Sequence, residues 1–413
     1  MENFTLLLKK YADFIVRVGV NPQPGQTLII NCCLEAAPLA RLCVRSAYEA
    51  GARDVLVNWS DNDVSRSRME LGSEEALTDF KSYQLRRYLD YAESEGGVCV
   101  LHILADDPEV YAGLDGAKIS RVNAAQRKFM APWREYTMND RVQWSIAAMP
   151  SAPWAKKIFP ELDEAAAIEK LWQLIFDVCR VTDGDPVNEW KAHLDRLTGL
   201  KDKMNALDLE SVHFESGNGT DLTVGIADKA VWESAASVSE KGVVFLPNIP
   251  TEEVFTAPHK DKVNGIVYGT KPYVFNGQLI KGFHVTFKDG RVVEHGADEG
   301  AELLGRLLDT DEGARSIGEV ALVPASSPIN RSGALFYSTL FDENAACHIA
   351  FGASYPGTTE NGTRLSKDEL LARGMNQSAI HEDVMVGAED SHITGKCRDG
   401  RTVELFRDGV WVL

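Results

Sequence analysis

The sequence predicts an α/β N-terminal domain with a mostly parallel sheet, followed by an α+β C-terminal domain with an antiparallel sheet. Short apolar runs alternate with helical patterns as far as about residue 150, which is typical of a parallel sheet with covered faces. Beyond about residue 205, short strand-like runs are joined by tight-turn pairs such as Asp289-Gly290, and such turns connect antiparallel neighbours.

The elements of the N-terminal domain follow from this alternation. Strands are expected where apolar runs are bounded by turn residues, at 27–32, 54–59, 97–104 and 144–148. Helices are expected between and before them, near 3–18, 35–50, 73–95 and 116–135. The turn after the first strand, 31–37, lacks the G-x-G-x-x-G pattern of dinucleotide-binding folds, so no such cofactor is expected.

The domain boundary is expected in a long helical stretch at 163–206, which gives domains of 1–195 and 196–413. The C-terminal domain then becomes rich in strands, which are predicted at 209–216, 222–226, 242–246, 265–268 and 273–275. Hairpin turns of type I′ are predicted at Asn276-Gly277, Asp289-Gly290, Asp399-Gly400 and Asp408-Gly409.

Composition excludes several classes of protein. The 413 residues carry 43 basic and 61 acidic side chains, and the net charge of −18 disfavours binding to nucleic acid or to anionic membranes. No apolar run approaches the roughly 18 residues that cross a bilayer. Seven cysteines without a C-x-x-C pair suggest reduced thiols, so we expect a cytoplasmic protein without a thiolate metal site.

The most informative residues are His381 and Asp383, which lie two apart in the strand-like run 380–387 and so share one face. Glu319 occupies an otherwise apolar run, where an unpaired carboxylate would cost several kcal/mol and a metal would offset that cost. Imidazole and carboxylate donors suit divalent Zn, Co, Mn or Mg. By themselves, His381 and Asp383 equally fit two ligands of a mononuclear iron oxygenase.

Four segments in order, at 248–259, 316–324, 341–352 and 380–387, resemble the aminopeptidase T and aminopeptidase S family of dinuclear metallo-aminopeptidases. The resemblance implies a hydrolase that releases N-terminal amino acids from peptides and forms homodimers. Two divalent ions of Zn, Co, Mn or Mg would activate a water molecule. The C-terminal domain would carry the metal site.

The resemblance also implies roles for individual residues. The implied metal ligands are Glu253, Glu319, His348, His381 and Asp383, and of these Glu319 and Asp383 are the candidates to bridge two ions. Glu319 and Tyr355 are the implied catalytic residues, with the Tyr355 hydroxyl available to the developing oxyanion.

Two alternatives to a peptidase stay open at this point. The iron oxygenase would need a third ligand downstream of Asp383, and only His392 follows there. A non-catalytic protein that binds metal for stability is the other alternative, which five intact ligands make a weaker hypothesis.

Overall fold

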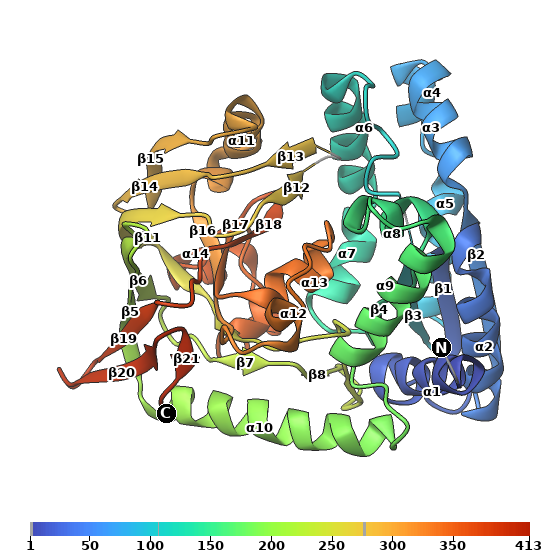
Figure 1. The fold of residues 1–413 in the computed structure, drawn as a ribbon, viewed down its shortest axis with the longest axis horizontal. Helices are drawn as coiled ribbons and strands as arrows, with labels where there is room; N and C mark the ends of the chain where they lie inside the picture. Colours follow the sequence, from blue (N-terminus) through green and yellow to red (C-terminus); the bar gives the residue numbers. More distant parts are fainter. Residues whose placement is uncertain (1–2, 106, 276–277) are drawn as a thin grey trace. The chain divides into compact units, whose positions relative to one another are not determined.

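The structure is a computed structural model that describes residues 3–105, 107–275 and 278–413. The chain forms two compact units, one of residues 1–193 and 236–250 and one of residues 194–235 and 251–413. Figure 1 shows the order of the elements along the chain. Among the described residues, no helix is both long and apolar enough to cross a bilayer.

The segment 236–250 returns to the first unit, whereas the sequence places it in the C-terminal domain. Its contacts explain this, because Ile249 N donates to Ile146 O (3.0 Å) and Leu246 N donates to Gly19 O (2.8 Å). The predicted strand at 242–246 shrinks to β9 (Val244–Phe245), which pairs with β8 (Ser237–Val238). That the chain divides into two domains near residue 195 stays a prediction.

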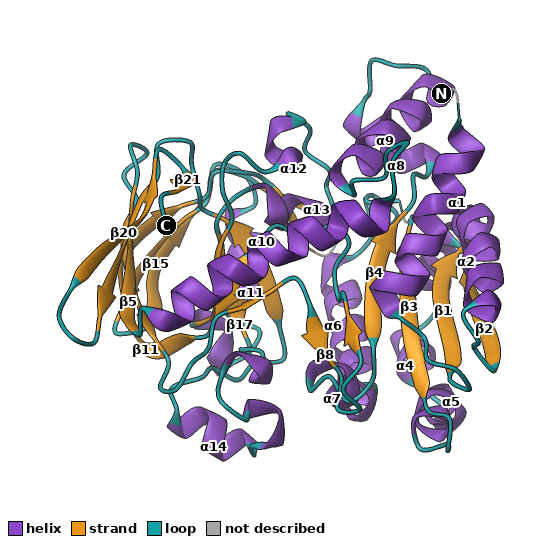
Figure 2. Cartoon of the chain, turned by 90° about the horizontal axis from the view of Figure 1, so that it is seen from below, coloured by secondary structure: helices purple, strands orange, loops and turns teal. Residues whose placement is uncertain are grey.

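The first unit contains a four-stranded parallel sheet, as the sequence predicts, and its strands lie in the order β2-β1-β3-β4. Its strands are β1 (Thr27–Cys33), β2 (Asp54–Ser60), β3 (Val98–Leu104) and β4 (Trp144–Ala148). Helices pack on the sheet (Figure 2), with α2 (Ala37–Glu49) against β1 and β2, and α5 (Ser82–Ala92) and α7 (Ala131–Met138) on the core around Ile29. Apolar strands with covering helices account for the parallel arrangement.

Helix boundaries follow local side-chain chemistry. α1 (Phe4–Phe14) continues as a π-helical segment (Ile15–Val20), and further helices are α3 (Asn62–Leu71), α6 (Gly116–Phe129), α8 (Ala152–Ile158), α9 (Glu164–Val178) and α10 (Pro186–Ala206). The stretch predicted as one helix at 73–95 divides into α4 (Glu74–Thr78), which Ser73 caps, and α5. The stretch at 116–135 divides before α7, because Pro132 is accommodated only in the first turn of a helix.

The second unit contains an eight-stranded antiparallel sheet in the order β15-β14-β11-β6-β5-β19-β20-β21. The strands are β5 (Leu209–Glu215), β6 (Asp221–Ile226), β11 (Pro258–Tyr268), β14 (His284–Lys288), β15 (Arg291–Gly296), β19 (His392–Cys397), β20 (Thr402–Arg407) and β21 (Val410–Trp411). Asp289 (φ 48°) and Gly290 (φ 81°) form the predicted turn between β14 and β15. The predicted Asn276-Gly277 turn lies outside the described residues, between the paired strands β12 (Tyr273–Phe275) and β13 (Gln278–Ile280).

A five-stranded antiparallel sheet in the order β18-β17-β16-β10-β7 completes the second unit. It consists of β7 (Glu233–Ser234), β10 (Val254–Thr256), β16 (Ile317–Leu322), β17 (His348–Gly352) and β18 (His381–Met385). Every residue of β16 and β17 is buried. One face of the sheet joins the apolar core through Val320, Ile349 and Val384, so the alternate residues of these strands face the other way. The predicted α+β architecture is confirmed.

Short helices connect the strands of the second unit. They are α11 (Ala301–Leu308), α12 (Pro328–Arg331), α13 (Thr339–Asp342) and α14 (Lys367–Ala372). α13 leads directly into a 3₁₀ turn, Glu343–Ala345, which precedes β17. This connection brings a polar segment of the chain beside the five-stranded sheet.

Candidate metal centre

The register of three strands brings two of the predicted ligands together. Glu319 on β16 lies opposite Ala350 on β17, and Ala350 lies opposite Asp383 on β18. Residues in one row across a sheet project from the same face. The two carboxylates therefore flank Ala350. Because the Ala350 side chain is only a methyl group, it leaves open the space between the carboxylates on this face of β17.

The other predicted ligands reach the same place from neighbouring positions. His348 precedes Ala350 by two residues and His381 precedes Asp383 by two, so both rings project from the face that carries the carboxylates. Glu253 comes directly before β10, which pairs with β16. The structure thus gathers all five predicted ligands, from four adjacent strands or their ends.

Glu319 is common to two groups of donors, one with Glu253 and His348 and one with His381 and Asp383. Its Oε1 atom lies 3.4 Å from His348 Nε2, and its Oε2 atom lies 3.8 Å from His381 Nε2. In the first group, Glu253 Oε2 lies 3.1 Å from His348 Nε2. In the second, Asp383 Oδ1 lies 3.5 Å from His381 Nε2. Each oxygen of Glu319 is thereby directed toward a different imidazole.

Backbone carbonyl groups fix the orientation of both imidazole rings. His348 Nδ1 lies 3.2 Å from Ala346 O, and His381 Nδ1 lies 2.7 Å from Ala353 O. With Nδ1 donating its proton to a carbonyl, the Nε2 lone pair of each ring is free to bind a metal. The same interactions hold Nε2 toward the carboxylates.

A bound metal would satisfy the donor atoms of the cluster more fully than the hydrogen bonds among them do. Among the described residues, the buried atoms His348 Nε2 and Asp383 Oδ1 have no hydrogen-bond partner, although Glu253 Oε2 approaches His348 Nε2 to 3.1 Å without hydrogen-bond geometry. Buried polar atoms without partners are costly. Imidazole nitrogens and carboxylate oxygens are ligands for divalent ions of the zinc and manganese type, so a cation between them would satisfy both atoms.

Protonation in the metal-free site follows from burial and from opposite charges. Burial raises the pKa of Glu319, and this effect exceeds the opposing effect of the nearby histidines. For His381, burial lowers the pKa, but the Asp383 carboxylate raises it, and the pKa is about 9. Burial raises the pKa of Asp383, yet the charge of His381 brings it below its usual range. Without metal, protons on the imidazoles therefore balance the carboxylates.

Tyr355 lies next to this cluster, at the start of the 3₁₀ turn Pro356–Thr358. Its ring packs edge-on against His381, with 4.6 Å between the ring centroids and 61° between the planes. Burial and the surrounding carboxylates, Glu319 first among them, raise its pKa well above the usual value. The phenol therefore stays neutral and can donate a hydrogen bond.

Two further polar residues that the sequence does not single out support the site. Asn344 Oδ1 accepts a hydrogen bond from Glu252 N (2.7 Å), next to the predicted ligand Glu253. Asn376 Nδ2 donates to Gly352 O (2.7 Å), at the end of β17. Asn344 lies inside the segment 341–352 that also contains His348, and this position is its only sequence signal. Asn376 lies outside the four segments and has no such signal.

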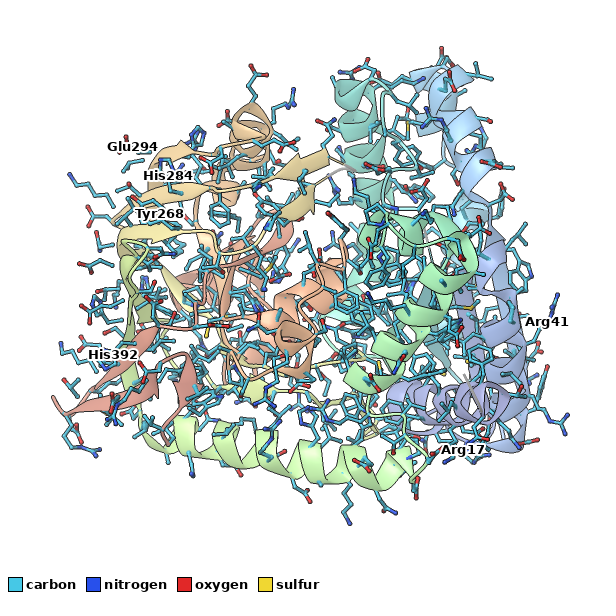
Figure 3. All side chains as sticks on the ribbon, viewed as in Figure 1. Arg17, Arg41, Tyr268, His284, Glu294 and His392 are labelled. Atoms are coloured by element: carbon cyan, nitrogen blue, oxygen red, sulfur yellow. The ribbon has the colours of Figure 1, made fainter. Side chains whose placement is uncertain are left out.

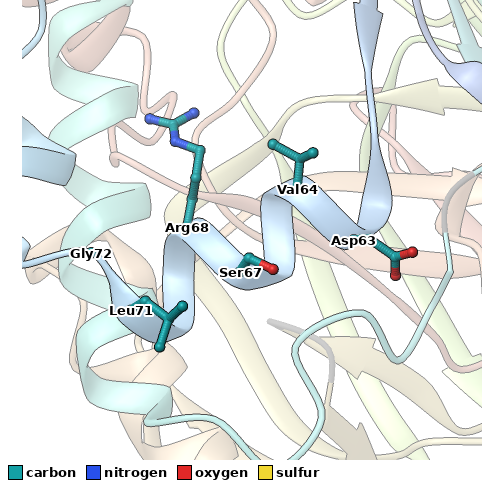
Figure 4. A pocket seen from close by; sticks show the side chains of 6 residues that line it. All are labelled: Asp63, Val64, Ser67, Arg68, Leu71 and Gly72. Carbon is teal, nitrogen blue, oxygen red and sulfur yellow. The ribbon is translucent and has the colours of Figure 1, made fainter.

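Histidines outside the cluster have other environments. His392 lies on β19 of the eight-stranded sheet (Figure 3), 3.1 Å from Glu404, and His284 packs against Tyr268 with 5.6 Å between ring centroids. A surface hollow in the first unit runs along α3 (Figure 4) and is lined by Asp63, Val64, Ser67, Arg68, Leu71 and Gly72. It contains none of the predicted site residues, and Leu71 there is 81% exposed.

Comparison with known proteins identifies the family of the chain. The profile of the thermophilic metalloprotease (M29) family matches residues 4–411. The chain belongs to this family. Aminopeptidase 2 of Geobacillus stearothermophilus is 45% identical over 411 residues, covering 100% of this chain and 99% of that protein. Aminopeptidase T of Thermus aquaticus is 41% identical over 413 residues and covers all of both chains.

A solved structure of a family member has the same fold. Wild-type AmpT from Thermus thermophilus superposes with a TM-score of 0.92 at 37% identity and covers 99% of this chain and 100% of that one. The predicted enzyme class, a metallo-aminopeptidase that uses divalent metal, is confirmed by these M29 relatives. The iron-oxygenase and non-catalytic alternatives are not favoured.

Proposed function

We propose that this M29 protein releases single amino acids from the N-termini of peptides by means of two divalent ions, each held by one of the two donor groups. The observation that carries the proposal is the position of Glu319, whose two carboxylate oxygens are directed toward two different histidines. A carboxylate placed in this way is the usual bridge between two metal ions. Asp383, the other candidate bridge, lies 4.0 Å from His348 Nε2 and 3.5 Å from His381 Nε2.

The two groups divide the ligands between the ions. Glu253 and His348 would hold one ion with Glu319, while His381 and Asp383 would hold the other with the same carboxylate. When bound, the ions would polarise the peptide carbonyl and lower the pKa of a water molecule so that it can attack. Zn, Co, Mn and Mg all accept this set of nitrogen and oxygen donors.

Tyr355 and Glu319 are the proposed catalytic residues. The neutral Tyr355 hydroxyl, beside His381, would donate a hydrogen bond to the carbonyl oxygen as negative charge develops on it. The Glu319 carboxylate, which would lie beside the attacking water, would accept a proton from it and return that proton to the leaving amine.

The proposal also includes the assembly and location that the sequence predicts. Most soluble oligomers are symmetric dimers, and we propose a homodimer in the cytoplasm. All seven cysteines are buried thiols, which is compatible with a reducing compartment. Sedimentation velocity at several protein concentrations tests the assembly, because a dimer predicts a mass of twice 45.5 kDa.

Aminoacyl chromogenic substrates test the activity. We expect chelation to abolish hydrolysis and a divalent ion to restore it, and we expect peptides with an acetylated N-terminus to resist cleavage. Glu319→Gln and His348→Ala should each lower kcat at least about 100-fold, whereas His392→Ala on β19 of the eight-stranded sheet is the matched control and should change little. Full activity in both site variants would contradict the assignment.

A further inference from the structure

The helix α3 has one face that packs inside the first unit and an opposite face that is exposed. Met69 packs with Ile119 and Val122 of α6 in a small apolar core. The opposite face borders the surface hollow (Figure 4). Its exposed side chains are Asp63, Val64, Ser67, Arg68 and Leu71.

The apolar side chains of the exposed face have the spacing of a coiled-coil seam. Val64 and Leu71 lie seven residues apart with Ser67 between them, as the a, d and a positions of a heptad do. Leu71 is the most exposed large apolar side chain among the described residues, at 81%, and Val64 is 57% exposed. Met69 then occupies position f, which faces away from a coiled-coil partner and here faces the core of its own unit. The seam is therefore directed outward, where a partner helix would cover it.

The charges beside the seam are complementary between two copies of the chain. Asp63 and Arg68 occupy the flanking g and e positions, and within the described part of the chain neither side chain forms an ion pair or a hydrogen bond. In a parallel pair of helices, position g of one lies across from position e of the other, so Asp63 faces the partner subunit's Arg68. An antiparallel pair would instead bring equal charges together, because each flank then faces its own counterpart.

We propose that α3 forms a contact of the homodimer, in which it pairs in parallel with α3 of a second copy of the chain. This inference rests on the proposed function only in its assumption of a homodimer. Val64, Ser67 and Leu71 meet their counterparts across a two-fold axis that runs along the helices, and the two pairs of Asp63 and Arg68 fix the register. A stable interface covers about 800 Å² of each partner, so a helix of 10 residues supplies one part of it.

A cysteine at position 67 tests the parallel arrangement. Position d faces itself across the two-fold axis of a parallel pair, and all seven native cysteines are buried. Under oxidation with copper phenanthroline, most of the full-length Ser67→Cys protein should migrate as a covalent dimer on a non-reducing gel and as a monomer after reduction. Ser65→Cys, at position b of the same helix, is the matched control and should stay monomeric on the gel. Equal crosslinking of the two variants, or none in either, would overturn the proposal.

Charge reversal tests the register without a crosslink. Asp63→Lys and Arg68→Glu each place equal charges across the seam, so each should raise the dimer dissociation constant at least about tenfold in sedimentation equilibrium on the metal-loaded protein. The double variant Asp63→Lys/Arg68→Glu reverses both partners and should return to within about threefold of the wild type. Arg41→Glu, which reverses an exposed arginine on α2, should leave the constant unchanged. A double variant that dissociates as readily as the single ones would refute the pairing.

Mixing the two single variants separates weak pairing from misfolding. Asp63→Lys and Arg68→Glu subunits together restore both ion pairs, so the mixture should form a heterodimer about as stable as the wild type. Misfolded subunits would form no such heterodimer, and failure of two folded variants to combine would count against the proposal.

The outcome for α3 is distinguishable from failure of the proposed function. A wild-type protein that is monomeric at every concentration would contradict the proposed homodimer. If the wild type is a dimer that Ser67→Cys does not crosslink and charge reversal does not weaken, only the role of α3 is wrong. Hydrolysis of aminoacyl substrates by the wild type is measured separately and tests the peptidase activity.

Discussion

Ala350 shows how a single small side chain shapes the metal centre. It lies in the middle of the row Glu319–Ala350–Asp383, fully buried between the two carboxylates. A methyl group at this position forms the floor of the site, and every larger side chain would project into the space that the ions require. The ligands alone therefore do not define the centre.

Ala350→Leu should remove metal binding. The larger side chain would fill the space between Glu319 and Asp383 and would cost roughly 1–3 kcal/mol of stability through overpacking. Elemental analysis and urea unfolding measure the two effects. Ile349→Val, on the opposite face, is the control and should keep its metal while losing about 1 kcal/mol. An Ala350→Leu protein with a full metal content would contradict this account of the floor.

Metal binding should release protons. The pKa of His381 is about 9 in the metal-free site, so at pH 7 its Nε2 atom carries a proton that a metal must displace. The apparent affinity for metal should then rise with pH up to about 9. Below pH 9, it should fall about tenfold for each pH unit and each displaced proton. Calorimetry in buffers of different ionisation enthalpy counts the protons. Binding that is independent of pH between 6 and 8 would refute protonated imidazoles in the metal-free protein.

At the scale of elements, loops hold the ends of the strands that carry the ligands. Asn376 is buried just before β18, and its Nδ2 donates to Gly313 O (2.8 Å) and Gly352 O (2.7 Å), while its backbone N donates to Ser354 Oγ (3.1 Å). These bonds join the ends of β16 and β17 to the segment that leads into β18. The relative positions of Glu319, His348 and His381 depend on this connection.

Asn376→Ala should destabilise the second unit. Loss of the carboxamide removes a donor from the buried Gly352 carbonyl, at a cost of about 1–3 kcal/mol, whereas the half-buried Gly313 carbonyl still accepts from Ser316 N. Urea unfolding with the metal removed measures the change. Asn188→Ala in α10, which removes an exposed hydrogen bond to Asp185, should stay within about 0.5 kcal/mol of the wild type. Equal effects of the two substitutions would refute the role of Asn376.

The sequence predicts which side chains share a face of β18, but it does not predict the register between the strands. Alternation alone places His381 and Asp383 together, because side chains two apart in a strand share a face. The row from Glu319 through Ala350 to Asp383 depends instead on how strands about 30 residues apart align, which tertiary packing decides. Glu253, outside a three-residue strand, has no local signal at all, and only the family resemblance pointed to it.

At the scale of the whole molecule, all five candidate ligands belong to the second unit. Metal binding should therefore stabilise that unit by RT ln(1 + [L]/Kd), about 2.7 kcal/mol at 100 times Kd. Hydrogen exchange should show that chelation lowers protection in β16, β17 and β18 and leaves β1 to β4 nearly unchanged. Uniform loss of protection in both units would contradict a metal centre confined to the second unit.

Anomalous diffraction from zinc-loaded crystals tests the central claim most directly, because the peaks locate each ion independently of activity. The account predicts two zinc peaks in each subunit, one bound by Glu253, Glu319 and His348 and the other by Glu319, His381 and Asp383. A single peak, or two peaks that do not share Glu319, would contradict it.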